Sequence, residues 1–122
     1  MSSRLAKLRR SAFSAQNGCC FYCGLPMWED DPDLFAQTLG LTARQAQRLR
    51  STAEHLQARC DGGIDHPSNI VAACAHCNQK RHLGRKVARS WTEHKAWVQR
   101  RLSAGQWFDQ GMLSRLWRAA LR

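Results

Sequence analysis

Long apolar runs are missing from this sequence. No stretch approaches the roughly 18 consecutive apolar residues that a membrane-spanning helix needs, so the chain is not expected to cross a membrane. A secretory signal is also missing, because the N-terminal segment MSSRLAKLRRSAFSAQ is basic and has no apolar centre. We therefore expect a cytoplasmic protein, whose thiols bind metal more often than they form disulfides.

Acidic residues are scarce. The chain has nine Asp and Glu against nineteen Lys and Arg, a formal net charge of +10 and a pI near 10.2. Such a balance favours an anionic partner. Nucleic acid, most simply double-stranded DNA, is the first candidate, and an anionic membrane surface is the second. The length of 122 residues fits one domain, residues 1–122. Its hydrophobic core would be modest, so disulfides or a structural metal ion would add useful stability.

Two hydrophobic patterns in the middle of the chain predict a β-hairpin. The stretch TAEHL alternates as a strand does, and NIVAAC is a β-branched run typical of a second strand, paired with the first across a loop containing Gly62 and Gly63. The following AHCNQKRHLGRK has polar residues repeating at four, which favours a helix. Together these elements predict an α+β fold.

Capping residues predict helices on both sides of the hairpin. Residues 2–15 form an amphipathic basic helix, for which a solvated face and a DNA contact are equally good explanations. Thr42 and Gln45 have capping-box spacing, as do Ser90 and Glu93. A last helix, within residues 112–122, is expected to face the core with four residues: Leu113, Leu116, Trp117 and Ala120. The acidic stretch EDDPD, residues 29–33, is expected to be an exposed linker.

Cysteines are the strongest chemical signal. Six are present, an even number that a disulfide-rich secreted scaffold would also have. Four of them form two C-x2-C pairs, Cys20 with Cys23 and Cys74 with Cys77, which supply four thiolates for a tetrahedral zinc ion. We predict a structural zinc site, with buried thiols or disulfides as the alternative. Cys19 competes with Cys20 for this site, whereas the remaining Cys60 is expected to be a free thiol.

The pair Glu54–His55 raises a second possibility. On a strand, adjacent side chains point to opposite faces, so one residue could hold a metal while the other handles a proton. On this pair alone, a solvated strand end is the simpler explanation. Hydrolysis of a phosphodiester needs a base to activate water and a cation to absorb developing charge. Histidine suits the first task near neutral pH, and carboxylate or amide oxygens suit Mg²⁺ or Mn²⁺ in the second.

Four stretches, weak singly, are specific when taken in order: CFYC, EHLQARCDGG, HPSNIVAAC and CAHCNQKRH. They resemble the HNH endonucleases, in particular the zinc-stapled group of ββα-metal, or His-Me finger, nucleases. The resemblance covers residues 20–82, about half of the chain. It implies a β-hairpin and a helix around one divalent cation, and cleavage that leaves 5′-phosphate and 3′-hydroxyl ends.

The resemblance also implies individual roles. His55 would be the general base, Asn69 would support the hairpin loop that orients it, and Glu54 and Asn78 would be ligands of the catalytic Mg²⁺ or Mn²⁺. His82 lies where some members use a further histidine near the metal. Position 54 is more often Asp or His in the family, so Glu54 could bind the cation directly or through water. Asn78 stands where other members have His.

Basic residues after the hairpin are the candidates for phosphate contacts. Residues 84–122 carry nine Lys and Arg against two acids, interleaved with tryptophans that helical spacing favours as core rather than base-stacking residues. Phosphate contacts position a protein without reading sequence. The candidates are Lys80, Arg81, Arg85, Lys86, Arg89, Arg100 and Arg101.

Taken together, the sequence predicts a small α+β nuclease that cuts DNA with one divalent cation. Its parts are a basic helix at residues 1–18, a zinc-stapled HNH-like core at 19–83 with a helical insert near 33–50, and a basic helical extension at 84–122. The main alternative is a zinc-knuckle DNA-binding module without catalytic activity. A third possibility is a nuclease-like adaptor that binds a partner protein through its acidic insert.

Overall fold

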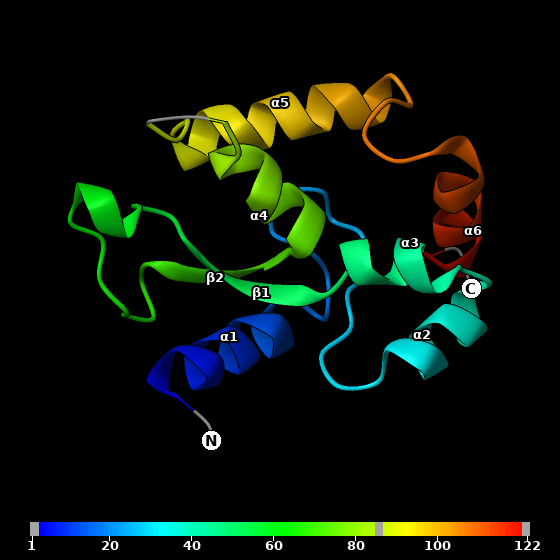
Figure 1. The fold of residues 1–122 in the computed structure, drawn as a ribbon, viewed down its shortest axis with the longest axis horizontal. Coiled ribbons are helices and arrows are strands. Elements are labelled where there is room, and N and C mark those ends of the chain that lie inside the picture. The colour runs from blue at the N-terminus through cyan, green and yellow to red at the C-terminus, as the bar shows by residue number, and fades with distance from the viewer. Residues whose placement is uncertain (1–2, 85–86, 121–122) are drawn as a thin grey trace.

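A two-stranded hairpin and the helix after it form the centre of the molecule (Figure 1). The computed structural model describes residues 3–84 and 87–120. Its elements are α1 (Arg4–Ala15), α2 (Pro32–Leu39), α3 (Ala43–Arg48), β1 (Ser51–His55), the 3-10 turn η1 (Arg59–Asp61), β2 (Ile70–Cys74), α4 (Ala75–His82), α5 (Trp91–Ser103) and α6 (Gln110–Ala120). Within this part of the chain no helix is long and apolar enough to cross a membrane.

The hairpin pairs β1 with β2 in antiparallel register, from Ser51 opposite Cys74 to His55 opposite Ile70. Helix α4 begins directly after β2, with Cys74 as its N-cap. Helix α1 packs on the hairpin, and α4 returns across it, so that the hairpin lies between these two helices (Figure 1). The predicted α+β fold with a ββα core is confirmed.

The core spreads from the hairpin to the C-terminal helix. Apolar side chains from the segment after α1, from β2 and from α6 form one buried cluster, which includes Tyr22, Leu49, Ala72, Met112 and Leu116. The inward-facing prediction for α6 is correct at Leu113 and Leu116 but wrong at Trp117, whose exposed fraction is 56%. Met112 is buried instead, because 112, 113 and 116 share one helical face. The side chain of Ala120 lies outside the described residues.

The segment of residues 29–33 differs from the expected linker. Asp31 caps α2 by accepting a hydrogen bond from the backbone N–H of Leu34, and Pro32 is already helical. An acidic N-cap followed by proline is a helix start, and this signal outweighed the turn-forming tendency of Pro32. Glu29 forms an ion pair with Arg9, at 2.8 Å from its guanidinium Nε. The acidic residues therefore serve local structure.

Capping predictions hold elsewhere. Thr42 and Gln45 form the reciprocal capping box of α3, and Ser90 caps α5 through the Glu93 backbone N–H. Helix α4 is shorter than AHCNQKRHLGRK suggests and ends at His82, because Leu83 is extended and Gly84 has a φ of 71°. Ser2, within the first predicted helix, and Arg85 and Lys86 lie outside the described residues.

Candidate active site and metal centre

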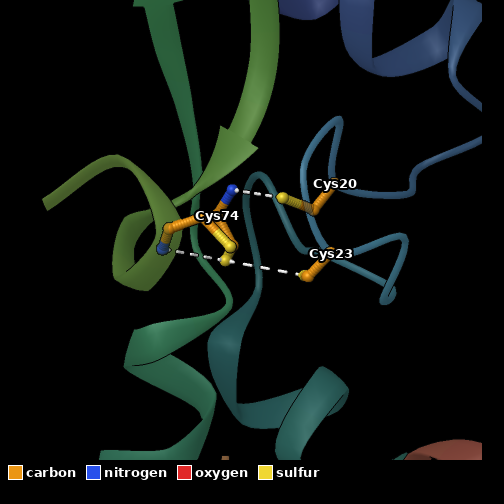
Figure 2. Close-up of side chains that lie close together, drawn as sticks. Cys20, Cys23 and Cys74 are labelled. Atoms are coloured by element: carbon orange, nitrogen blue, oxygen red, sulfur yellow. Dashed lines mark hydrogen bonds between the residues drawn. The ribbon is translucent and has the colours of Figure 1, made fainter. Parts of the chain in front are cut away.

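Four cysteine side chains converge where the hairpin meets α4. Cys20 and Cys23 come from the loop after α1, Cys74 ends β2, and Cys77 lies in the first turn of α4. Their sulfur atoms all lie within 4.8 Å of one another, and all four residues are buried. Figure 2 shows Cys20 and Cys23 facing Cys74 across the cluster. This group has the composition and spacing of a structural zinc site.

Backbone and side-chain donors surround these sulfurs. The Cys20 Sγ accepts hydrogen bonds from the backbone N–H groups of Tyr22, at 3.4 Å, and of Cys74, at 3.2 Å. The Trp107 indole donates to Cys77 Sγ at 3.2 Å, and His94 Nε2 lies 2.8 Å from the Cys77 carbonyl. Trp107 and His94 belong to the C-terminal extension, residues 84–122. That extension therefore packs around the cysteine cluster.

The pKa shifts of Cys20, Cys74 and Cys77 show why a cation suits the cluster. Burial, reinforced by the neighbouring sulfurs, raises the pKa of Cys74 and Cys77 well above the ordinary value. Burial also opposes ionisation of Cys20, but hydrogen bonds within the cluster outweigh it and lower the pKa of Cys20. Several thiolates cannot ionise together in a dry site unless a positive ion compensates them. The donor set is soft, as zinc prefers.

The other two cysteines stand apart from the cluster. Cys19 is half-buried and its thiol lies 3.7 Å from the Asn17 carbonyl. Cys60 is exposed on η1. All six thiols are free. The group of four converging sulfurs contains Cys20 and not its neighbour Cys19.

Glu54 is the most constrained of the predicted metal ligands. Its side chain is 2% exposed. The Oε2 atom accepts from the Tyr22 hydroxyl at 2.8 Å and from Arg81 Nη1 at 3.2 Å. The Oε1 atom lies 3.3 Å from Nε2 of His82, so the structure brings Glu54 and His82 together. Burial, and then the Glu54 charge, raise the pKa of Tyr22 above its usual range, so that the phenol remains a donor.

Arg81 is buried, contrary to its prediction as a DNA contact. Its side chain is 3% exposed and donates to the backbone carbonyls of His55, Leu56 and Arg89, each at 2.8 Å, besides pairing with Glu54. The prediction was wrong because Arg81 lies on the helix face that packs on β1, a placement that charge alone does not reveal. Its guanidinium anchors the end of that strand.

Asn78 lies one turn before His82 on α4. Its amide nitrogen Nδ2 donates to Thr52 Oγ1 at 3.0 Å and to the Ala53 carbonyl at 3.3 Å. Both bonds go to β1, and they fix the orientation of the amide. Within the described ranges the amide oxygen Oδ1 has no hydrogen-bond donor, so it remains available as a ligand atom.

His55 has a separate set of partners on the loop that joins the strands. Its Nε2 atom lies 2.7 Å from Oδ1 of Asp65, and Arg59 donates to both Asp65 oxygens at 3.1 Å. The hydrogen bond from His55, with Arg59 nearby, lowers the pKa of Asp65. Arg59 Nε also lies 3.3 Å from the same His55 Nε2 atom, so His55, Asp65 and Arg59 form one hydrogen-bonded group at the start of the loop. Asp65 and Arg59 were not among the predicted site residues.

Asn69 closes the loop that carries these partners. Its Oδ1 accepts from the Gln57 backbone N–H at 2.8 Å, and its Nδ2 donates to the carbonyls of Gln57 and Ile64 at 3.1 and 3.0 Å. The loop is tight: a Cβ on Gly63 would lie 1.8 Å from the Gln57 carbonyl oxygen, and Gly62 has a φ of 87°. Asn69 thus joins both ends of the loop.

Two groups of side chains emerge from this geometry. Glu54, Asn78 and His82 lie between β1 and α4, whereas His55 bonds with Asp65 in the β1–β2 loop. In the described structure no hydrogen bond joins the His55 ring to the side chains of the first group. The separation follows from strand alternation, since neighbours on a strand point to opposite faces.

The predicted DNA contacts occupy varied positions. Lys80 and Arg100 are exposed. Arg89 and Arg101 stack on Trp97, at 4.2 and 5.8 Å from the ring centre, and Arg85 and Lys86 lie outside the described residues.

Burial, with Lys80 and Arg48 nearby, lowers the pKa of His76 to about 4, so His76 is neutral between the aromatic rings it contacts.

The hairpin, α4 and the cysteine cluster define a small α+β protein with a ββα centre and a buried four-cysteine group suited to zinc. Residues 43–84 match the family model described as HNH endonuclease, in agreement with the resemblance noted in the sequence. The matched stretch runs from the start of α3 past the end of α4 and includes Glu54, His55, Asn69, Asn78 and His82. Cys20 and Cys23 lie before it. No curated protein and no solved structure matches the chain.

Proposed function

We propose that this protein is a metal-dependent endonuclease that hydrolyses phosphodiester bonds in DNA. The observation that carries the proposal is the HNH match over residues 43–84, the stretch in which the hairpin and α4 position a carboxylate, an amide and two histidines. The family is one of nucleases, and a carboxylate beside histidine is not needed by a protein that only binds DNA.

Glu54, Asn78 and His82 would hold the catalytic cation. Oε1 of Glu54 and Nε2 of His82 are 3.3 Å apart, and the Asn78 amide is oriented through its nitrogen so that its oxygen is free. Oxygen donors of this kind suit Mg²⁺ or Mn²⁺. Such a cation stabilises the negative charge that develops on the phosphate. The Arg81 contact to Oε2 leaves one carboxylate oxygen of Glu54 for this task.

His55 would activate the attacking water. In the tautomer that donates from Nε2 to Asp65, the carboxylate would hold the ring and Nδ1 would be free to take a proton from water. Asn69 keeps the loop of Asp65 closed and thereby positions the ring indirectly. The resulting imidazolium would be stabilised by the Asp65 carboxylate, as in other carboxylate–histidine pairs.

The four cysteines would hold a structural zinc ion. Zinc would join the loop after α1 to the junction of β2 and α4, which are 51 residues apart between Cys23 and Cys74. Because all four ligands come from the protein, such a site has no open position for substrate. Its task is to stabilise the fold, separate from the oxygen-rich site at Glu54.

Plasmid cleavage tests the proposed function. Purified protein with Mg²⁺ or Mn²⁺ should convert supercoiled plasmid to nicked or linear DNA, and His55→Ala prepared in the same way should not. A wild-type protein that shifts plasmid in a gel but leaves it intact with either metal would favour the non-catalytic zinc-knuckle module.

A further inference from the structure

A cationic pocket lies between α3 and α4, beside the Asn78–His82 site. It has a volume of about 550 Å³, and four of its lining residues are cations: Arg44, Arg48, Arg50 and Lys80. We call it the α3–α4 pocket. Figure 1 shows α3 ending where β1 begins, next to the first turn of α4. The residues that line the pocket therefore come from α3, from the residue before β1 and from α4.

The charges of this pocket are not compensated. No acidic residue lines it, and within residues 3–84 and 87–120 none of the four cations has an ion-pair partner. Arg44 and Arg48 are one helical turn apart, a spacing at which like charges destabilise a helix slightly. Converging exposed cations that offer no benefit to the fold indicate an anionic ligand.

The pocket continues into the proposed active site. A neighbouring hollow is lined by Thr52, Asn78 and His82, and it shares Arg50, Ala75 and Gln79 with the α3–α4 pocket. An extended anion could therefore pass from the cations to the candidate metal ligands without leaving the surface. A nucleic-acid strand has this shape and charge, with regularly spaced phosphates.

We infer that the α3–α4 pocket binds the phosphate backbone of the nucleic acid and leads one strand to the Asn78–His82 site. The inference rests on the proposed function, because it names the substrate-binding surface of that site. It assigns the phosphate contacts to Arg44, Arg48, Arg50 and Lys80, of which only Lys80 was a candidate from the sequence. The insert helix α3 then belongs to substrate binding.

The salt dependence of DNA affinity tests this inference. Affinity for a fluorescently labelled DNA duplex would be measured at several NaCl concentrations, without added Mg²⁺ or Mn²⁺. Arg44→Gln/Arg48→Gln should reduce the slope of log affinity against log salt by about 2, since each phosphate contact contributes about 0.9. Lys80→Gln, on a different element, should reduce it by about 1.

The matched comparison is Arg100→Gln/Arg101→Gln, which removes the same charge from α5. We expect this pair to change the slope by less than the α3 pair does. Zinc content and the thermal unfolding midpoint should stay at wild-type values in the pocket variants, because the substituted side chains are exposed. An unchanged slope in the α3 pair and in Lys80→Gln, or an equal change in the α5 pair, would overturn the inference.

Plasmid cleavage by the wild-type protein separates this inference from the proposed function. If the wild-type protein cleaves plasmid but the pocket variants keep the wild-type salt dependence of DNA affinity, only the inference about the pocket is rejected. Pocket-dependent binding by a wild-type protein that does not cut would support the pocket and reject the nuclease.

Discussion

Glu54 combines a structural role with a proposed role as a metal ligand in one side chain. One carboxylate oxygen is bound by Tyr22 and Arg81 in the interior, and the other reaches His82. Removal of the carboxylate would leave the Arg81 charge buried without a counter-charge, a costly state. A variant at position 54 would therefore report on stability as well as on metal binding, and neighbouring residues give cleaner tests.

Asn78→Ala should raise the Mg²⁺ concentration needed for half-maximal plasmid cleavage. The variant removes one oxygen ligand but leaves Glu54 and His82 in place. Its fold should be nearly intact, because the lost hydrogen bonds to Thr52 and Ala53 contribute about 1 kcal/mol each. Initial rates over a range of Mg²⁺ concentrations measure the effect. An unchanged metal requirement would remove Asn78 from the ligand set.

His55→Ala should lower the cleavage rate by about 10² to 10⁴, or roughly 3 to 5 kcal/mol of activation free energy. The zinc cluster and the α3–α4 pocket are formed by other residues, so zinc content and DNA binding should be retained. Single-turnover cleavage and a gel shift on the same preparation measure the two properties. Wild-type cleavage by this variant, with contaminating nuclease excluded, would disprove the general-base role.

Asp65→Asn should lower kcat for cleavage by about one to two orders of magnitude, with little change in KM. Asparagine keeps the size of the side chain but cannot stabilise an imidazolium at His55. If Asp65 acts only through His55, the variant should have no further effect in a His55→Ala background. Asp65→Glu should restore part of kcat. If KM instead rose by as large a factor as kcat fell in these variants, the result would indicate general damage to the loop.

At the scale of elements, α4 contributes to the cysteine cluster and to the proposed catalytic metal site with different faces. Its first turn carries Cys77 toward the cysteine cluster, and its last turn carries His82 toward Glu54. Between them, Arg81 binds carbonyls at the end of β1 and at Arg89. A side chain that satisfies three carbonyls and a buried carboxylate positions helix and strand relative to each other.

Arg81→Ala should therefore destabilise the protein by about 3 to 5 kcal/mol, because Glu54 would be left charged in the interior. The control is Lys80→Ala, an adjacent and exposed cation of the same helix, whose effect should be within about 0.5 kcal/mol. Urea unfolding of both variants measures the difference. Equal stability of the two variants would mean that the Arg81–Glu54 contact does not support the fold.

At the scale of the whole molecule, the cysteine cluster ties together segments from the N-terminal loop, the hairpin and α4. Trp107 and His94 extend its surroundings into the C-terminal third, and α6 adds Met112, Leu113 and Leu116 to the core. Truncation before residue 105 would therefore remove core residues along with basic ones. Loss of DNA binding after such a truncation would reflect misfolding.

Zinc removal should unfold the protein. Purified protein should contain about one zinc per chain, and because structural zinc contributes roughly 10 to 16 kcal/mol in small domains, its loss exceeds the usual stability of a domain. Cys20→Ala should abolish zinc binding and cooperative unfolding. Cys60→Ala, at an exposed thiol outside the cluster, should do neither. Folded protein without zinc would contradict the assignment.

Local sequence patterns determined several secondary-structure elements of this protein and its cysteine cluster. The capping box of Thr42 and Gln45, the alternation around Glu54 and the two C-x2-C pairs each depend on neighbouring residues, so the sequence alone was sufficient to predict α3, the hairpin and the cysteine cluster. The order of the four motifs was sufficient to predict the match to the HNH family model over residues 43–84.

Only the tertiary structure decided which cations are buried and which residues become partners across the chain. Lys80 and Arg81 are neighbours of similar charge, yet packing of α4 on β1 buries one and exposes the other. Asp65 beside His55, and Arg44, Arg48 and Arg50 beside Lys80, are separated in sequence and meet through chain folding. Burial and long-range contacts depend on how elements pack, and local periodicity carries no information about a partner many residues away.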